Sequence, residues 1–172
     1  EIILAFIVIS PILGTIAAFI LMTLVIKIFR KHNATYANRY FKRLQLLSAA
    51  AYSLSHGGND AQKTMGIVAV LLFSSGYLGS EFYVPFWVAM MAHLAIALGT
   101  LSGGWRIIRT MGGKITKLDP MHGFSAETAG AAVIMGSTFF GIPVSTTHVI
   151  AGSIIGVGAT RRLSAVRWGL AR

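Results

Sequence analysis

The chain has 172 residues, of which 55% are hydrophobic and only 12% are charged, against roughly 25% charged residues in a typical soluble domain. This composition excludes an ordinary soluble protein and indicates an integral membrane protein. The net charge of +10 comes from fifteen Lys and Arg residues, fourteen of which cluster between apolar stretches. The positive-inside rule accounts for such clusters as cytoplasmic loops, so we expect no nucleic-acid partner.

The first apolar stretch covers residues 2–29 and is interrupted by Pro11. Because a helix needs about 20 residues to cross a bilayer, this stretch predicts a tilted or kinked span. A second span is predicted from Tyr83 to Leu101, with Trp87 and Trp105 as interfacial anchors. The basic residues that follow each span place both of those ends on the cytoplasmic side.

The stretch between these spans, residues 44–78, must then lead from the inside to the outside. Its 35 residues are too many for one simple helix and too few for three crossings. Gly57 and Gly58 lie near its centre, so we expect a discontinuous helix that breaks at the glycines. Irregular backbone at membrane depth is tolerated only inside protein or beside an aqueous cavity, and the break therefore predicts a cavity.

The stretch from Met121 to Thr160 starts and ends beside basic segments, which predicts a re-entrant hairpin with its turn at residues 141–143. Gly152 and Gly156 have the GxxxG spacing that permits close helix contact, and packing is their more natural role. The expected fold is all-α, a polytopic membrane protein with discontinuous helices and a re-entrant hairpin. Residues 1–172 are expected to form a single transmembrane unit.

Asp60 is the most informative residue of the chain. A charged side chain at bilayer depth costs about 2.5–3.5 kcal/mol, so such residues are candidates for a functional site. A helix that restarts at Asp60 would present its first amides to an anion. Asn59 and Asp60 are also favoured helix caps, which is the structural alternative. Lys63 has the spacing to pair with Asp60 on one helix face.

A second polar group follows the predicted turn. Ser145, Thr146 and Thr147 open an apolar helix, and their hydroxyls with free backbone amides suit a tetrahedral oxyanion. His148 is a candidate for proton coupling or an ordinary structural histidine. Glu127 is an isolated acid that either binds a cation or bonds a neighbouring helix.

No pattern of an enzyme is present. The chain has no cysteine, which excludes disulfides, thiolate metal sites and cysteine catalysis, and it has no GxSxG, HExxH or P-loop motif. Ser145 and His148 form a local pair without an evident orienting acid, so a membrane hydrolase is weakly supported. We expect no enzyme activity and no cofactor, and the sequence leaves any metal undefined.

The two polar elements carry a resemblance to a known family. The chain is similar to the inorganic phosphate transporter (PiT) family, in particular to the C-terminal half of a bacterial member. That family has a GANDVANA-like signature in each of two inverted halves, which stands here as Gly-Gly-Asn-Asp-Ala-Gln-Lys-Thr at residues 57–64. Its PVSTTH element stands intact at residues 143–148. The resemblance implies one half of an inverted-repeat transporter in the bacterial cytoplasmic membrane.

The resemblance also implies roles for individual residues. Phosphate would be bound by Gly57, Gly58, Asn59, Asp60, Lys63, Ser145, Thr146 and Thr147. The coupling cation would be bound by Asp60, and the residues themselves, apart from the resemblance, add Glu127 and His148 as candidates. The signature's Val-Ala-Asn-Ala is Ala-Gln-Lys-Thr here, which puts Lys63 where an amide is usual. A fixed cation there favours coupling to a proton or a metal–phosphate complex over sodium.

The function expected from the resemblance is secondary active transport of inorganic phosphate by cation symport. The implied partners are inorganic phosphate, a coupling cation (a proton, sodium, or a divalent metal complexed to phosphate), membrane lipid, the missing N-terminal repeat of the same protein, and a second copy in a homodimer. A passive anion channel and a structural membrane subunit remain the alternatives.

Overall fold

The computed structural model describes residues 2–31, 33–113, 116, 118–142, 144–162 and 166. The regular structure of these residues is α-helical throughout, which confirms the all-α fold class. The helices are α1 (Ile2–Phe29), α2 (Ala34–Ser74), α3 (Phe86–Gly113), α4 (Pro120–Phe139) and α5 (Thr146–Ala159).

The two predicted spans are present as helices. Residues Ala5–Phe29 of α1 and Phe86–Trp105 of α3 are long and apolar enough to cross a membrane. The apolar side chains on the outer faces of α1 and α3 are largely exposed, among them Ile12, Ile20, Met91 and Leu98. Exposed apolar faces of this extent fit a surface covered by lipid or by further membrane helices.

The predicted break in α2 is wrong. The helix runs without interruption from Ala34 to Ser74, straight through Gly57 and Gly58. Each glycine costs about 1 kcal/mol relative to alanine inside a helix. Propagation of an existing helix is cooperative, and α2 also packs against α4, so two glycines do not end it. Asp60 therefore lies within a helix, and no helix N-terminus is available beside it on α2.

The predicted re-entrant hairpin is confirmed. After α4 ends, Gly141 has a φ of +67°, a conformation that glycine adopts without strain. The amide of Ile142 donates to the carbonyl of Ser137 at 2.8 Å, and the amide of Gly141 donates to Thr138 at 3.1 Å. This pair of bonds is the Schellman motif, which caps α4 and turns the chain back toward α5. Pro143 lies outside the described residues.

Glycines bring α1 and α5 into backbone contact. A Cβ atom on Gly152 would lie 2.1 Å from the carbonyl oxygen of Pro11, and one on Gly156 would lie 2.3 Å from that of Thr15. The hydroxyl of Thr15 donates to the carbonyl of Gly152 at 3.0 Å across the same contact. The packing role predicted for the GxxxG spacing is therefore confirmed.

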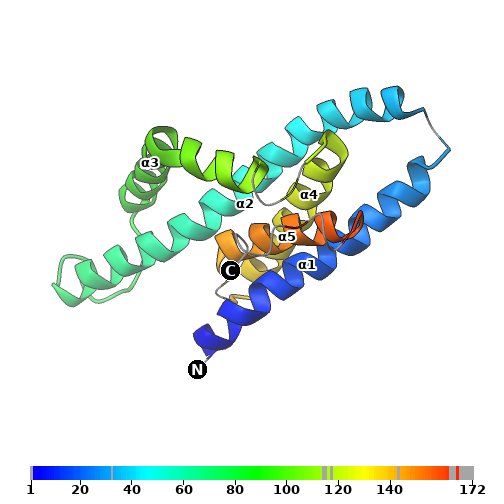
Figure 1. Cartoon of the computed structure of the whole chain (residues 1–172). Helices are drawn as coiled ribbons and strands as arrows, with labels where there is room; N and C mark the ends of the chain where they lie inside the picture. The colour runs from blue at the N-terminus through cyan, green and yellow to red at the C-terminus, as the bar shows by residue number, and fades with distance from the viewer. Residues whose placement is uncertain are drawn as a thin grey trace.

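The remaining helices surround this pair. α4 packs against α1, α2 and α5, and it shares a buried apolar core with α1 and α5 that includes Met22, Ala126 and Val157. α3 packs mainly against α2, and in Figure 1 its C-terminal half crosses α2 toward the start of α4. The helices α1, α4 and α5 pack against one another as a bundle. The long α2 meets the start of α5 near Asp60.

Candidate functional site

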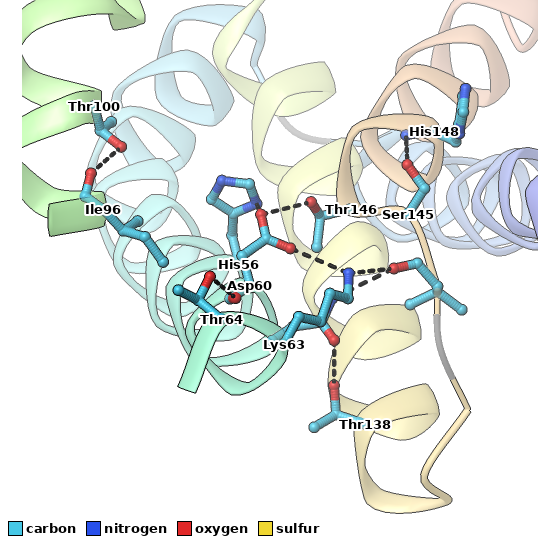
Figure 2. A network of polar contacts seen from close by, with 12 residues as sticks. His56, Asp60, Lys63, Thr64, Ile96, Thr100, Thr138, Ser145, Thr146 and His148 are labelled. Atoms are coloured by element: carbon cyan, nitrogen blue, oxygen red, sulfur yellow. Dashed lines mark hydrogen bonds and ion pairs between the residues drawn. The ribbon is translucent and has the colours of Figure 1, made fainter. Parts of the chain in front are cut away.

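The structure brings Asp60 of α2 and the first turn of α5 together. The hydroxyl of Thr146 donates to Oδ2 of Asp60 at 3.3 Å (Figure 2). Both side chains line one cavity of about 490 Å³, which is also lined by Lys63, Ser145 and Thr147. Residues 86 positions apart in the sequence thus face a common chamber.

Lys63 ties α2 to the segment before α5. Its ammonium donates to Oδ1 of Asp60 at 3.3 Å, which confirms the predicted pairing on one helix face. It also donates to the carbonyl of Val144 at 3.0 Å. The side chains of Lys63 and Asp60 are 47% and 34% exposed, so this ion pair contributes at most about 1 kcal/mol to stability. Its main effect is to place a positive charge in the cavity.

The first turn of α5 supplies the helix N-terminus that α2 does not. Ser145 is the N-cap, and its hydroxyl oxygen accepts a hydrogen bond from the amide of His148 at 3.4 Å. The amides of Thr146 and Thr147 have no carbonyl within the helix to bond. They lie at the positive end of the helix dipole, beside the hydroxyls of residues 145–147 and the Lys63 ammonium. Such a grouping can bind a small oxyanion.

Asn59 lies behind this cavity instead of lining it. Its side chain is buried, its Nδ2 donates to the carbonyl of Val144 at 3.5 Å, and its Oδ1 accepts from the Thr138 hydroxyl at 3.4 Å. Asn59 therefore joins α2 to α4 and to the turn that leads into α5. Gly58 lines a second cavity with Asn59 and Thr138, and Gly57 lines a third cavity between α2 and α3.

The two other predicted cation residues lie apart from Asp60. Glu127 accepts a hydrogen bond from the hydroxyl of Ser48 at 2.5 Å, and Ser48 precedes Asp60 by about 18 Å along α2 at 1.5 Å per residue. The exposed ring of His148 lies away from Asp60 (Figure 2). Among the described residues, no group of three His, Cys, Asp or Glu side chains is placed to hold a metal ion.

Sequence reasoning missed one neighbour of Asp60. Nδ1 of His56 lies 3.6 Å from Oδ2 of Asp60, and the ring of His56 stacks on Tyr52 with centroids 5.9 Å apart. The sequence did contain a signal for this pair, because residues four positions apart face each other on one helix. The contacts of Thr138 and of the Val144 carbonyl have no comparable signal, because they depend on how the helices meet.

Comparison with known proteins gives a consistent result. Residues 1–172 match the profile of the phosphate transporter family. Over 165 residues the chain is 63% identical to a probable low-affinity inorganic phosphate transporter of Rhizobium meliloti (strain 1021) and 47% identical to one of Bacillus subtilis (strain 168). These alignments cover 96% of this chain and 49% and 50% of the two relatives, so the chain spans about half of their length.

The fold also resembles a solved structure. The chain aligns with the sodium-dependent phosphate transporter with a TM-score of 0.80 and 24% sequence identity. The alignment covers 98% of this chain and 59% of that protein. At this identity, the likeness establishes the fold alone.

Proposed function

Since this chain belongs to the phosphate transporter family, we propose that it forms about half of a secondary active transporter that carries inorganic phosphate through a membrane together with a cation. The named relatives are transporters and not enzymes, in agreement with the lack of an enzyme motif. Residues 1–172 act in this proposal as one transmembrane unit. An N-terminal repeat of the same protein completes the site, and a second copy completes a homodimer.

The observation that carries the proposal is the contact between Asp60 and Thr146 across a shared cavity. Phosphate binds at the start of α5, where it accepts hydrogen bonds from Ser145, Thr146 and Thr147 and from the Lys63 ammonium. Phosphate oxygens suit this arrangement because hydroxyls, amides and an ammonium all donate.

The negative charge of Asp60 is the reason why the proposed site requires a cation. A carboxylate beside phosphate is repulsive, by about 4 kcal/mol for two unit charges 4 Å apart at an effective dielectric constant of about 20. A cation that neutralises Asp60 removes this repulsion, and phosphate in turn strengthens binding of the cation. If the cation and phosphate then cross the membrane together, transport of one is coupled to transport of the other. Glu127 and His148 remain secondary candidates for cation binding, outside the phosphate cavity.

The test is phosphate uptake by the whole protein that carries this chain, purified and reconstituted in proteoliposomes. Asp60→Asn should abolish cation-driven uptake without loss of insertion, whereas the control Glu81→Gln, an exposed acid outside the site, should retain it. Wild-type rates in correctly inserted Asp60→Asn protein would refute the proposal.

A second measurement separates the alternatives. A symporter accumulates radiolabelled phosphate against its gradient, and accumulation collapses with an uncoupler or on removal of sodium, depending on the coupling ion. A passive channel only equilibrates phosphate. A structural subunit loses no uptake when either polar element is changed. Varying sodium and pH independently identifies the coupling cation.

A further inference from the structure

Both oxygens of the Asp60 carboxylate already have partners within the chain. Oδ1 accepts from Lys63 at 3.3 Å, and Oδ2 accepts from Thr146 at 3.3 Å and lies 3.6 Å from Nδ1 of His56. Each carboxylate oxygen has two lone pairs, so these contacts leave room for a metal cation. A cation can also arise without any further ligand, because one of the partners, the His56 imidazole, is itself able to take up a proton.

His56 is held in a defined orientation toward Asp60. It lies one turn before Asp60 on α2, and its ring is within 9° of parallel to the ring of Tyr52. The Tyr52 ring is in turn packed against α4, because a Cβ on Gly130 would lie 3.3 Å from it. Nδ1 of His56 is buried, and its distance of 3.6 Å from Oδ2 of Asp60 is longer than a hydrogen bond. The two groups therefore form an ion pair only when the ring is protonated.

The opposite side of His56 belongs to a different cavity. This cavity has a volume of about 750 Å³ and lies between α2 and α3, where its lining includes Tyr52, His56, His93 and Thr100. In Figure 2 one ring nitrogen of His56 lies beside the Asp60 carboxylate and the other lies on the far side of the ring. His56 therefore connects the α2–α3 cavity with the carboxylate that faces the phosphate cavity.

We propose that His56 is the proton-binding group that couples phosphate transport to a proton, and that it exchanges this proton with the α2–α3 cavity. The neutral ring carries its hydrogen on Nδ1, toward Asp60. Nε2 takes up one proton from water, and the resulting imidazolium offsets the charge of Asp60, which stays a carboxylate. Release of the same proton from Nε2 restores the repulsion and expels phosphate. This inference rests on the proposed transport function.

The other groups around His56 set the balance of charge. On α2 these are Tyr52, Asp60 and Lys63, and α5 contributes the uncharged Thr146. α3 contributes His93, whose Nδ1 lies 2.7 Å from the carbonyl of Ala89 on its own helix. Nδ1 of His56 lies 3.6 Å from Oδ2 of Asp60, and Nζ of Lys63 lies 3.3 Å from Oδ1 of the same carboxylate. Phosphate would bring a second negative charge to this site, which already holds the Asp60 carboxylate.

The experiment compares His56→Gln with His93→Gln, the other histidine of the same cavity, in the whole protein in proteoliposomes. Accumulation driven by an imposed inward proton gradient is measured at constant external pH, so that the ionisation of phosphate stays fixed. Exchange of labelled for unlabelled phosphate is measured without any gradient. His56→Gln should lose accumulation by about tenfold or more, the effect of removing an interaction between charged groups, and exchange should fall with it because nothing then offsets the charge of Asp60. His93→Gln should keep both.

A second variant tests the inference independently of any disturbance that glutamine causes in the site. His56→Lys places a permanent positive charge beside Asp60, so it should retain exchange and make accumulation insensitive to the proton gradient. Proton-driven accumulation at the wild-type rate in His56→Gln would overturn the inference. So would loss of exchange in both variants, which would assign His56 to phosphate binding. A wild-type protein driven by sodium alone overturns the inference but leaves transport intact, whereas no accumulation under any gradient overturns the transport function itself.

Discussion

Helix α5 meets α1 and α2 in opposite ways. Toward α1 it presents glycines, and the two backbones approach until a Cβ on Gly152 would lie 2.1 Å from the carbonyl oxygen of Pro11. Toward α2 it presents the Thr146 hydroxyl, which reaches Asp60 by a hydrogen bond of 3.3 Å beside a cavity. The first contact leaves no room for displacement, whereas the second exchanges readily with water or a ligand. We therefore expect α1 and α5 to move as one body and α2 to move against them.

The largest effect should come from breaking the α1–α5 contact. Gly152→Leu forces a side chain onto the backbone of α1, which cannot yield without separating the helices. We expect a loss of about 3 kcal/mol or more in stability, at the upper end of overpacking, seen as a lower thermal unfolding midpoint of the purified protein in detergent.

The control for this change is Gly136→Ala on α4, where an added Cβ meets nothing within 4 Å. This variant should be as stable as the wild type or gain up to about 1 kcal/mol from helix propensity. Equal unfolding midpoints for the two variants would show that the α1–α5 contact is not tightly packed.

The next effect concerns the positive charge on the α2 side. Lys63→Gln removes the ammonium that bonds Asp60 and the Val144 carbonyl. We expect the KM for phosphate uptake to rise at least about tenfold, because a charged donor contributes about 1.5–3 kcal/mol. The unfolding midpoint should change little, because the pair is half exposed. A large drop in stability with an unchanged KM would contradict the view that α5 packs tightly against α1 and binds phosphate on its α2 side.

A smaller effect is expected from a single hydroxyl. Thr146→Val keeps the shape of the side chain but removes the hydrogen bond to Asp60. The matched variant is Thr147→Val, which removes a hydroxyl from the same cavity but leaves the bond between Thr146 and Asp60 in place. Both should raise the KM by a few fold, as expected for about 1 kcal/mol per hydroxyl, and Thr146→Val should also change the dependence on the coupling ion. Identical ion dependence in the two variants would argue against a role for the Asp60–Thr146 contact.

The smallest effect on uptake should come from the hydrogen bond that connects α2 with α4. Thr138→Val removes the hydrogen bond from the Thr138 hydroxyl to Asn59, which is 3.4 Å long. We expect a loss of about 0.5–1.5 kcal/mol in stability and a near-normal KM, since Asn59 lies behind the phosphate cavity. A KM effect as large as that of Lys63→Gln would move Asn59 into the binding site.

The parts of the fold that the sequence predicts well are those with local causes. The hairpin follows from Gly141, whose conformation and hydrogen bonds end α4. The spans follow from uninterrupted apolar runs, and the close α1–α5 contact follows from Gly152 and Gly156. The hairpin and the spans depend on residues near one another in the chain, whereas the glycines indicate a close contact without indicating that its partner is α1, 137 positions away.

The parts that it predicts poorly depend on how helices meet. Gly57 and Gly58 resemble a break, yet the hydrogen bonds of α2 continue through them because cooperativity outweighs two weak residues. The family signature pointed to Asp60 and the hydroxyls of α5. It did not indicate that Lys63 reaches the Val144 carbonyl or that His56 borders two cavities. Those contacts require the three-dimensional approach of α2 to its neighbours.

The unbroken length of α2 has a mechanical consequence. At 1.5 Å per residue its 41 residues extend for about 60 Å, twice the thickness of a bilayer's hydrocarbon core. Asp60 lies about 39 Å from the start of this rod, so a tilt of roughly 5° about Asp60 displaces the far end by about 3 Å. A small rotation of α2 about Asp60 therefore produces a displacement of several ångströms at the end of the helix, near the membrane surface.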